Sequence, residues 1–196
     1  MKKLSIATLL AFTAMTLPAK ADSLPTPVIC VISQASLDQT AALKSIIDQL
    51  QKKRAEVQKE LAADEKKLKD EDKSLSEQQK KLSEKDFATK RQDFEKRVHE
   101  IQTKLEIRRM QMEIAFEEAK KKVYDAFLKA ADEVKKEMGA NLILYKETVV
   151  TADDSFDVSN KVLEKLDKSL PTVAVVFKSE ADVKKLIQQQ GQGQQQ

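Results

Sequence analysis

Polar and apolar residues alternate with a helical period through the middle of this chain. Between Val28 and Met138 the sequence contains neither proline nor glycine, and over much of that stretch apolar residues recur every three or four positions. Charged residues and amides fill most of the positions between them. The pattern predicts two long helices that share a narrow coiled-coil seam. The first register comprises Leu43, Ile47, Leu50, Val57, Leu61, Leu68, Leu75 and Leu82, and the second comprises Phe94, Val98, Ile101, Leu105, Met112, Ala115 and Ala119.

The two registers meet near residues 82–87, where the heptad phase breaks. Ser83 and Asp86 have the spacing of a helix cap, so a second helix is expected to begin there. This predicts an antiparallel helical hairpin over residues 38–138 with its tip near 82–87. One unbroken helix over the same residues is the alternative interpretation.

The ends of the predicted hairpin carry their own signals. Ser36 through Gln39 has the form of a capping box, which places the start of the ascending helix at Asp38. Gly139 stands where a left-handed cap would end the descending helix. Within the ascending helix the outer seam positions alternate between leucine and polar residues such as Asp64 and Glu71. A seam of this composition pairs weakly, so we expect the distal arm to be the softer part.

The descending helix has a second apolar stripe on the side away from its seam. It runs through Ile107, Met110 and Ile114 to Tyr124 and Leu128. The corresponding positions of the ascending helix are all polar. Because one hairpin cannot bury both faces of the descending helix, another subunit or a bound partner should cover the second stripe.

Short segments at either end of the hairpin predict a small body. Residues 22–37 contribute a strand at Val28–Ile32, and residues 139–187 contribute further elements. So few elements bury little surface, which favours a body completed by oligomerisation. The predicted fold class is therefore α+β, a small oligomeric β-body that carries a coiled-coil hairpin. The later elements are strands at Asn141–Tyr145, Thr148–Thr151 and Val173–Phe177, a helix at Ser159–Lys168, and a disordered Gln/Gly tail at 188–196.

The first residues have the features of a secretory signal. A basic start precedes an apolar run, and Ala19-Lys20-Ala21 has the small-x-small form of a cleavage site, so residues 1–21 are expected to be removed after Ala21. The alternative, a membrane anchor, is disfavoured because the run is too short to span a bilayer. Removal of Lys2, Lys3 and Lys20 from 35 basic residues leaves 32, which equals the 32 acidic residues. We therefore expect a neutral protein in an exported compartment, most simply the bacterial periplasm, without stable membrane insertion.

The sequence offers no catalytic constellation. His99 is the single histidine and sits on a charged helix, so a surface position is the simplest interpretation. Cys30 is the single cysteine, inside an apolar run, and is expected in the core. The carboxylate clusters are those of a chain that is 34% charged. We therefore expect no enzyme activity, no metal and no cofactor.

The order of these segments resembles the Skp/OmpH family of periplasmic chaperones over nearly all of the mature chain. The run Met138 to Leu144, followed by Asp153 to Leu163, is similar to the family's closing segment. Leu82-Ser83-Glu84 with Phe87 resembles its hairpin tip. The resemblance implies a jellyfish-like homotrimer whose arms enclose a cavity, where unfolded outer-membrane β-barrel proteins are held without ATP and kept from aggregating.

If the resemblance extends to function, client contacts are expected on the second stripe and near the tip. The predicted client-binding residues are Phe87, Phe94, Ile107, Met110 and Ile114. Inter-subunit packing is the alternative for this stripe and is favoured near the base. Two other functions remain open from sequence: a structural coiled-coil scaffold or adaptor of the cell envelope, and nucleic-acid binding through a mild basic excess over 80–109. The signal sequence and the neutral mature charge speak against nucleic acid as a partner.

Overall fold

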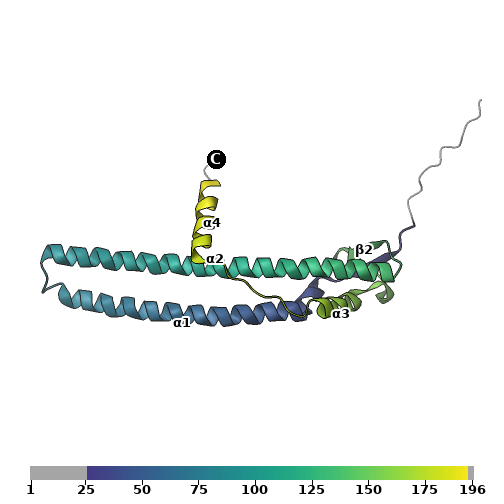
Figure 1. Cartoon of the computed structure of the whole chain (residues 1–196), viewed down its shortest axis with the longest axis horizontal. Helices are drawn as coiled ribbons and strands as arrows, with labels where there is room; N and C mark the ends of the chain where they lie inside the picture. Colours follow the sequence, from purple (N-terminus) through teal and green to yellow (C-terminus); the bar gives the residue numbers. More distant parts are fainter. Residues whose placement is uncertain (1–25, 194–196) are drawn as a thin grey trace, which may run out of the picture.

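The computed structural model describes residues 26–193, with side chains up to residue 189. Two long helices lie side by side and extend from a small base, and a further helix stands across one of them (Figure 1). The predicted signal peptide, residues 1–21, lies outside the described residues. The helices and strands are β1 (Ile29–Ile32), α1 (Ala41–Gln78), α2 (Glu84–Glu137), β2 (Leu142–Tyr145), α3 (Ser159–Ser169) and α4 (Glu180–Gly193), with short 3-10 helices at Gln34–Gln39, Lys146–Thr148 and Asp154–Phe156.

The base is built on two parallel strands. β1 pairs with β2 in a register that sets Ile29 opposite Leu142 and Ile32 opposite Tyr145. The strands are parallel because α1 and α2 together form the crossover between them, and a parallel pair needs such a long connection. α3 packs on α2 beside the sheet and buries Val162 fully.

The ascending helix begins later than the sequence predicted. Thr40, not Ser36, caps α1, and its hydroxyl oxygen accepts a hydrogen bond from the Leu43 N–H at 3.2 Å. The hydroxyl of Ser36 instead donates to the carbonyl oxygen of Ser33 at 2.5 Å, inside the first 3-10 helix. The predicted capping box was therefore wrong, because a residue that is itself in a helical turn cannot act as the extended cap.

Residues 79–83 connect the two long helices at the end far from the base. Ser83 caps α2: its oxygen accepts from the Asp86 N–H at 3.2 Å and its hydroxyl donates to the Asp86 carboxylate at 2.6 Å. At the other end, Gly139 has a φ of +64°. The N–H of Gly139 donates to the backbone carbonyl of Lys136, and the N–H of Ala140 donates to that of Lys135. These two bonds form a Schellman motif. The sequence signals for both ends of α2 are confirmed.

The apolar core is confined to the base half of the molecule. It joins the start of α1, the end of α2, the sheet and α3. Ile46 is fully buried, whereas Ile47, which the heptad register placed in the seam, is 41% exposed. No residue between positions 58 and 106 is buried. Ile46 of α1 belongs to a core cluster that also contains Phe127 of α2, Val162 of α3 and Val173, so the apolar face near the base is not limited to a two-helix seam.

The C-terminal region differs most from its prediction. Residues 148–151 form no strand, because Lys146–Thr148 is a 3-10 turn in which the Thr148 hydroxyl donates to the Tyr145 carbonyl. Residues 173–177 are extended but join no sheet. They follow the long helices toward α4, which crosses α2 (Figure 1). The predicted disordered tail is also wrong in part: α4 continues to Gly193, and residues 194–196 lie outside the described residues.

Candidate functional site

Two opposite faces of the paired helices are distinguished by what lies on them. On one face, which we call the strap face, the chain's own residues 171–179 (the strap) and α4 lie against Gln49, Ile107 and Gln111. The opposite face carries a depression that no other part of the described residues covers, which we call the open groove. It is lined by Ile47, Leu50, Gln51, Arg54, Arg109, Met112, Glu113 and Phe116.

The five predicted client-binding residues are spread over both the strap face and the distal arm. Ile107 is only 2% exposed and lies where α4 crosses α2. Met110 and Ile114 are partly exposed along the same side of α2. Phe87 is in the first turn of α2 and Phe94 lies seven residues further along the same helix, and both are half-buried. Phe87 and Ile114 are about 40 Å apart along the helix at its usual rise, so the five residues do not form one compact site.

The sequence predicted that something must cover the second stripe of α2. Part of the cover is the chain itself, because Val183 of α4 is fully buried at the crossing with α2. This possibility was not among those weighed from the sequence, where another subunit or a partner was expected. The signal that could have indicated it is the spacing of Val183, Leu186 and Ile187, which gives α4 an apolar edge.

The side chain of Gln49 holds the strap by hydrogen bonds to the strap's backbone. The side-chain amide of Gln49 donates to the carbonyl oxygen of Val173 at 2.8 Å, and its oxygen accepts from the N–H of Val175 at 3.0 Å. An amide side chain places an N–H donor and a carbonyl acceptor side by side, so it can satisfy both groups of an extended chain as a neighbouring strand would. Side chains of the strap alternate accordingly: Val173 is buried, whereas Val176 is 60% exposed.

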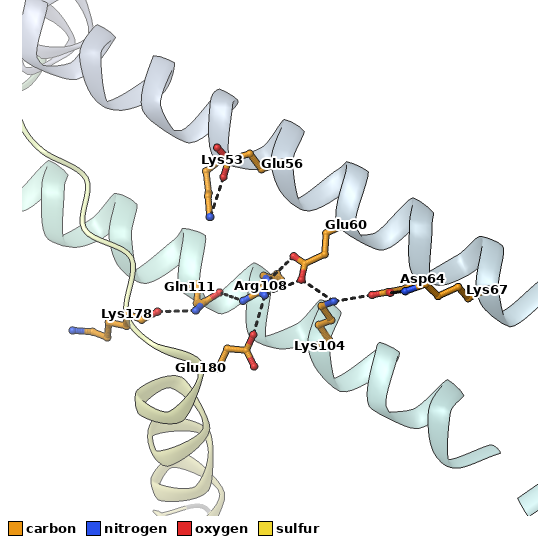
Figure 2. A network of polar contacts seen from close by, with 10 residues as sticks. All are labelled: Lys53, Glu56, Glu60, Asp64, Lys67, Lys104, Arg108, Gln111, Lys178 and Glu180. Atoms are coloured by element: carbon orange, nitrogen blue, oxygen red, sulfur yellow. Dashed lines mark hydrogen bonds and ion pairs between the residues drawn. The ribbon is translucent and has the colours of Figure 1, made fainter. Parts of the chain in front are cut away.

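A polar network joins both long helices to the strap and α4, with Arg108 at its centre (Figure 2). The guanidinium of Arg108 pairs with both oxygens of Glu60 on α1 and with Glu180 at 2.9 Å on α4. It also donates to the Gln111 side chain, whose amide donates to the Lys178 carbonyl oxygen at 2.6 Å. One cluster therefore fixes four segments of the chain to each other.

Glu60 is the main acceptor of this network. Hydrogen bonds from Arg108 and Lys104, together with their positive charges, lower the pKa of the Glu60 carboxyl to about 2. Lys104 also contacts Asp64 at 2.7 Å, and its pKa is raised by these two carboxylates. Glu60 is therefore ionised wherever the protein is expected to work, and the pairing stays intact at neutral pH.

The open groove is an apolar depression of about 460 Å³ between α1 and α2. Ile47, Leu50, Met112 and Phe116 supply its apolar surface. Arg54 and Arg109 stand at its edge. Sequence reasoning missed it because the heptad register assigned Ile47, Leu50 and Met112 to a closed seam. Exposed Glu113 also lines it, so the charged side chains are of both signs. An apolar floor with charged side chains around it suits weak contact with varied apolar segments, for which methionine is an adaptable lining.

The base carries a second apolar surface, around the sheet. Leu142 and Leu144 of β2 are 40% and 37% exposed, and Leu128 of α2 is 46% exposed beside them. These residues line a hollow of about 370 Å³ together with Phe127 and Tyr145. Exposed leucines on a two-stranded sheet are the kind of surface that a further chain covers.

The residues with potential reactivity are not brought together. His99 is exposed on α2, and Cys30 is buried in β1. Over residues 26–193, no three His, Cys, Asp or Glu side chains are grouped so that they could hold a metal ion. Within the same residues, no helix combines the length and the apolar character that a membrane crossing requires.

The fold and its surfaces define a class of protein: a small α+β base that carries a long pair of helices with uncovered apolar faces. The chain belongs to the OmpH-like family of outer membrane proteins, whose model matches residues 27–166. A crystal structure of an OmpH-like candidate outer membrane chaperone from Caulobacter crescentus has the same fold, with a TM-score of 0.73 and 19% identity over 83% of this chain and 98% of that one. No curated protein matches the sequence significantly. The family match ends before the strap and α4 begin.

Proposed function

We propose that this protein is a periplasmic holdase chaperone, which binds unfolded outer-membrane β-barrel proteins without ATP and prevents their aggregation. The observation that carries the proposal is the open groove, an apolar surface that the described residues leave uncovered on the arm of an OmpH-like protein. Weak apolar contacts distributed along an arm suit clients of different sequence. Membership of the family supports a chaperone role, and no enzymatic step is part of the proposal.

The working form is proposed to be a homotrimer whose arms enclose a cavity. The exposed Leu128, Leu142 and Leu144 support association through the base, because a two-stranded sheet with an apolar surface is marginal alone. Export to the periplasm, with cleavage after Ala21, rests on the signal-like start of the sequence.

Client contact in the free protein is proposed for Met110 and Ile114 and for Phe87 and Phe94 nearer the tip. These four side chains are partly exposed. Ile107 belongs to the same stripe, yet it reaches a client only after α4 has moved, because it is 2% exposed in this conformation.

The direct test is the aggregation of a urea-unfolded outer-membrane β-barrel protein on dilution, measured by light scattering with increasing amounts of the mature chain. Suppression that saturates near three subunits per client, without ATP, is the expected result for a trimeric holdase. A lack of suppression at every ratio would overturn the proposal and favour the alternative of a structural scaffold in the envelope.

A double variant and a control test whether the second stripe of α2, which lies outside the open groove, also contributes to client binding. Met110→Gln with Ile114→Gln should weaken suppression, because both side chains are partly exposed apolar groups on the arm. Val150→Gln is the matched control, since Val150 is fully exposed in a loop of the base. Equal suppression by wild type and the double variant would remove this stripe from the client-binding surface.

A further inference from the structure

Part of what holds the strap does not depend on the strap's own sequence. Three of its hydrogen bonds join side chains of the long helices to strap backbone: Gln49 with Val173 and with Val175, and Gln111 with Lys178. Any extended polypeptide presents the same carbonyl and N–H groups at the same spacing. The polar part of this surface therefore recognises an extended chain in general.

The apolar part of the surface has the same character. Val173 is 4% exposed and packs in the core of the base, whereas Val183 of α4 and Ile107 of α2 are 0% and 2% exposed nearer the crossing of the two helices. Alternate strap side chains point to the helices and to solvent, which is the pattern of a strand with one buried face. This is also the pattern along the transmembrane strands of β-barrel proteins, whose outward residues are apolar.

Contacts specific to the side chains of the strap and of the first residue of α4 lie at the C-terminal end of the strap. Lys178 pairs with Glu118 at 2.7 Å and Glu180 pairs with Arg108 at 2.9 Å. The ring of Phe177 lies 5.6 Å from the Lys53 ammonium group. All three pairings are partly exposed and are of the kind that contributes little individually in water. A competing segment could therefore replace the strap at modest cost.

We propose that the strap face is a binding site for an extended apolar segment of an unfolded polypeptide, and that the strap and α4 occupy this site in the free protein. The ligand class rests on the proposed holdase function. The segment adds to Gln49 and Gln111 as a strand adds to a sheet edge, and its alternate side chains take the places of Val173 and Val175. When the strap leaves, Ile107 becomes available to the client.

The test uses the full chain and a fluorescein-labelled peptide with the sequence of residues 171–189. Val173→Asp with Val183→Asp should release the strap, because each places a carboxylate at a buried position. Peptide binding, measured by anisotropy, should be at least about tenfold tighter for this variant than for wild type, in which the site is largely occupied. Val176→Asp is the matched control, since Val176 is 60% exposed, and it should bind the peptide as wild type does.

Two further arms make the outcome decisive. We call Val173→Asp with Val183→Asp the opened variant. Adding Gln49→Ala to it should abolish the gain in peptide affinity, because the backbone contacts are lost. Adding Gln51→Ala, on the open groove, should leave the peptide affinity unchanged. No binding of the peptide to the opened variant, or binding that does not depend on Gln49, would overturn the inference. A circular dichroism spectrum equal to wild type in helical content shows that the variant is folded.

The same samples separate this inference from the proposed function. Suppression of client aggregation without peptide binding would leave the holdase standing and reject the strap-face site. Peptide binding without suppression of aggregation would leave the strap-face site standing and reject the holdase function. If both hold, an unfolded β-barrel protein should displace the labelled peptide from the opened variant, and failure to displace it would exclude the proposed ligand class.

Discussion

The base half of the paired helices buries Ile46, Phe127 and Val134 almost completely, whereas the distal half, from residue 58 to residue 106, buries no side chain. In the distal half the helices are joined across the seam by ion pairs instead, among them Lys104 with Asp64 and Arg97 with Glu71. The two halves thus have the same secondary structure and different sources of cohesion.

This difference in cohesion between the two halves indicates which part of the molecule can move. Apolar burial is not weakened by the screening that salt exerts on charges, and a shared core opens cooperatively, so the base is expected to open only with global unfolding. Exposed ion pairs contribute little individually and are screened by salt, so the distal helices can separate at low cost. For a protein proposed to hold clients of different size, this places adaptability in the arm and leaves the base fixed.

The largest effect is expected from Phe127→Ala in the base. Phe127 is 1% exposed and packs in the core, so its truncation should lower the free energy of unfolding by about 3–5 kcal/mol. Leu75→Ala, at a partly exposed seam position, should cost less than about 2 kcal/mol. Urea unfolding at one fixed subunit concentration measures both, and equal losses would contradict a core confined to the base.

Two adjacent isoleucines test the same difference within one helical turn. Ile46→Ala should cost about 2–5 kcal/mol because Ile46 is fully buried. Ile47→Ala should cost less than about 1 kcal/mol, since Ile47 is 41% exposed at the open groove. Urea unfolding measures both costs. A larger cost for Ile47→Ala than for Ile46→Ala would support the seam position that the heptad pattern predicted for Ile47.

These two isoleucines also show which features could be predicted from the sequence and which could not. Caps and turns are local chemistry, so Ser83 and Gly139 located the ends of α2 correctly from sequence alone. A strict heptad describes two helices in isolation, and near the base α3 and the sheet add further partners to α2. Ile46 of α1 is buried in a cluster that includes residues of α3, the sheet and the strap, so its burial could not follow from the period of two helices.

The strap is a second feature that the sequence pattern could not predict correctly. Residues 173–177 have a strand-like pattern, and the sequence therefore predicted a strand in a sheet. In the structure a side chain, Gln49, supplies the hydrogen bonds that a neighbouring strand would have supplied. Nothing in the local pattern distinguishes these partners, because both satisfy the same backbone groups. The client-binding role of the second stripe therefore stays a prediction: Met110 and Ile114 are partly exposed, while the cover over Ile107 comes from residues distant in sequence.

Helix caps give an intermediate effect. Thr40→Ala and Ser83→Ala each remove one side-chain hydrogen bond to a backbone N–H and should each cost about 1 kcal/mol. Thr40 is 1% exposed in the base, so its loss should lower the urea midpoint. Ser83 is exposed at the tip, so its loss should instead speed amide exchange near the start of α2. Thr40→Ser and Ser83→Thr keep the cap and serve as controls; a lower midpoint for Ser83→Ala would show that tip and base unfold together.

The smallest effect is expected from the ion pairs of the distal half, and pH isolates it. The pKa of Glu60 is lowered from 4.5 to about 2 by Arg108 and Lys104. A carboxyl with a depressed pKa in the folded protein stabilises it fully above pH 4.5, and this contribution is lost as the pH falls through about 2. Acid also weakens the base, where Lys146 and Ser159 lower the pKa of Asp157 to about 2, but the buried apolar core there does not titrate.

Amide exchange, corrected for the intrinsic pH dependence, should therefore show protection falling first in residues 58–71 and 97–106 as the pH decreases from 4.5 toward 2. Glu60→Gln should lose some protection already at pH 7 and show a smaller decrease on acidification, because the charge that titrates is gone. Glu65→Gln is the matched control, since Glu65 is exposed on the same helix and forms no ion pair within the described residues. Protection lost at the same pH in both halves would mean that cohesion of the arm does not come from these pairs, and the contrast between the halves would then rest on the core alone.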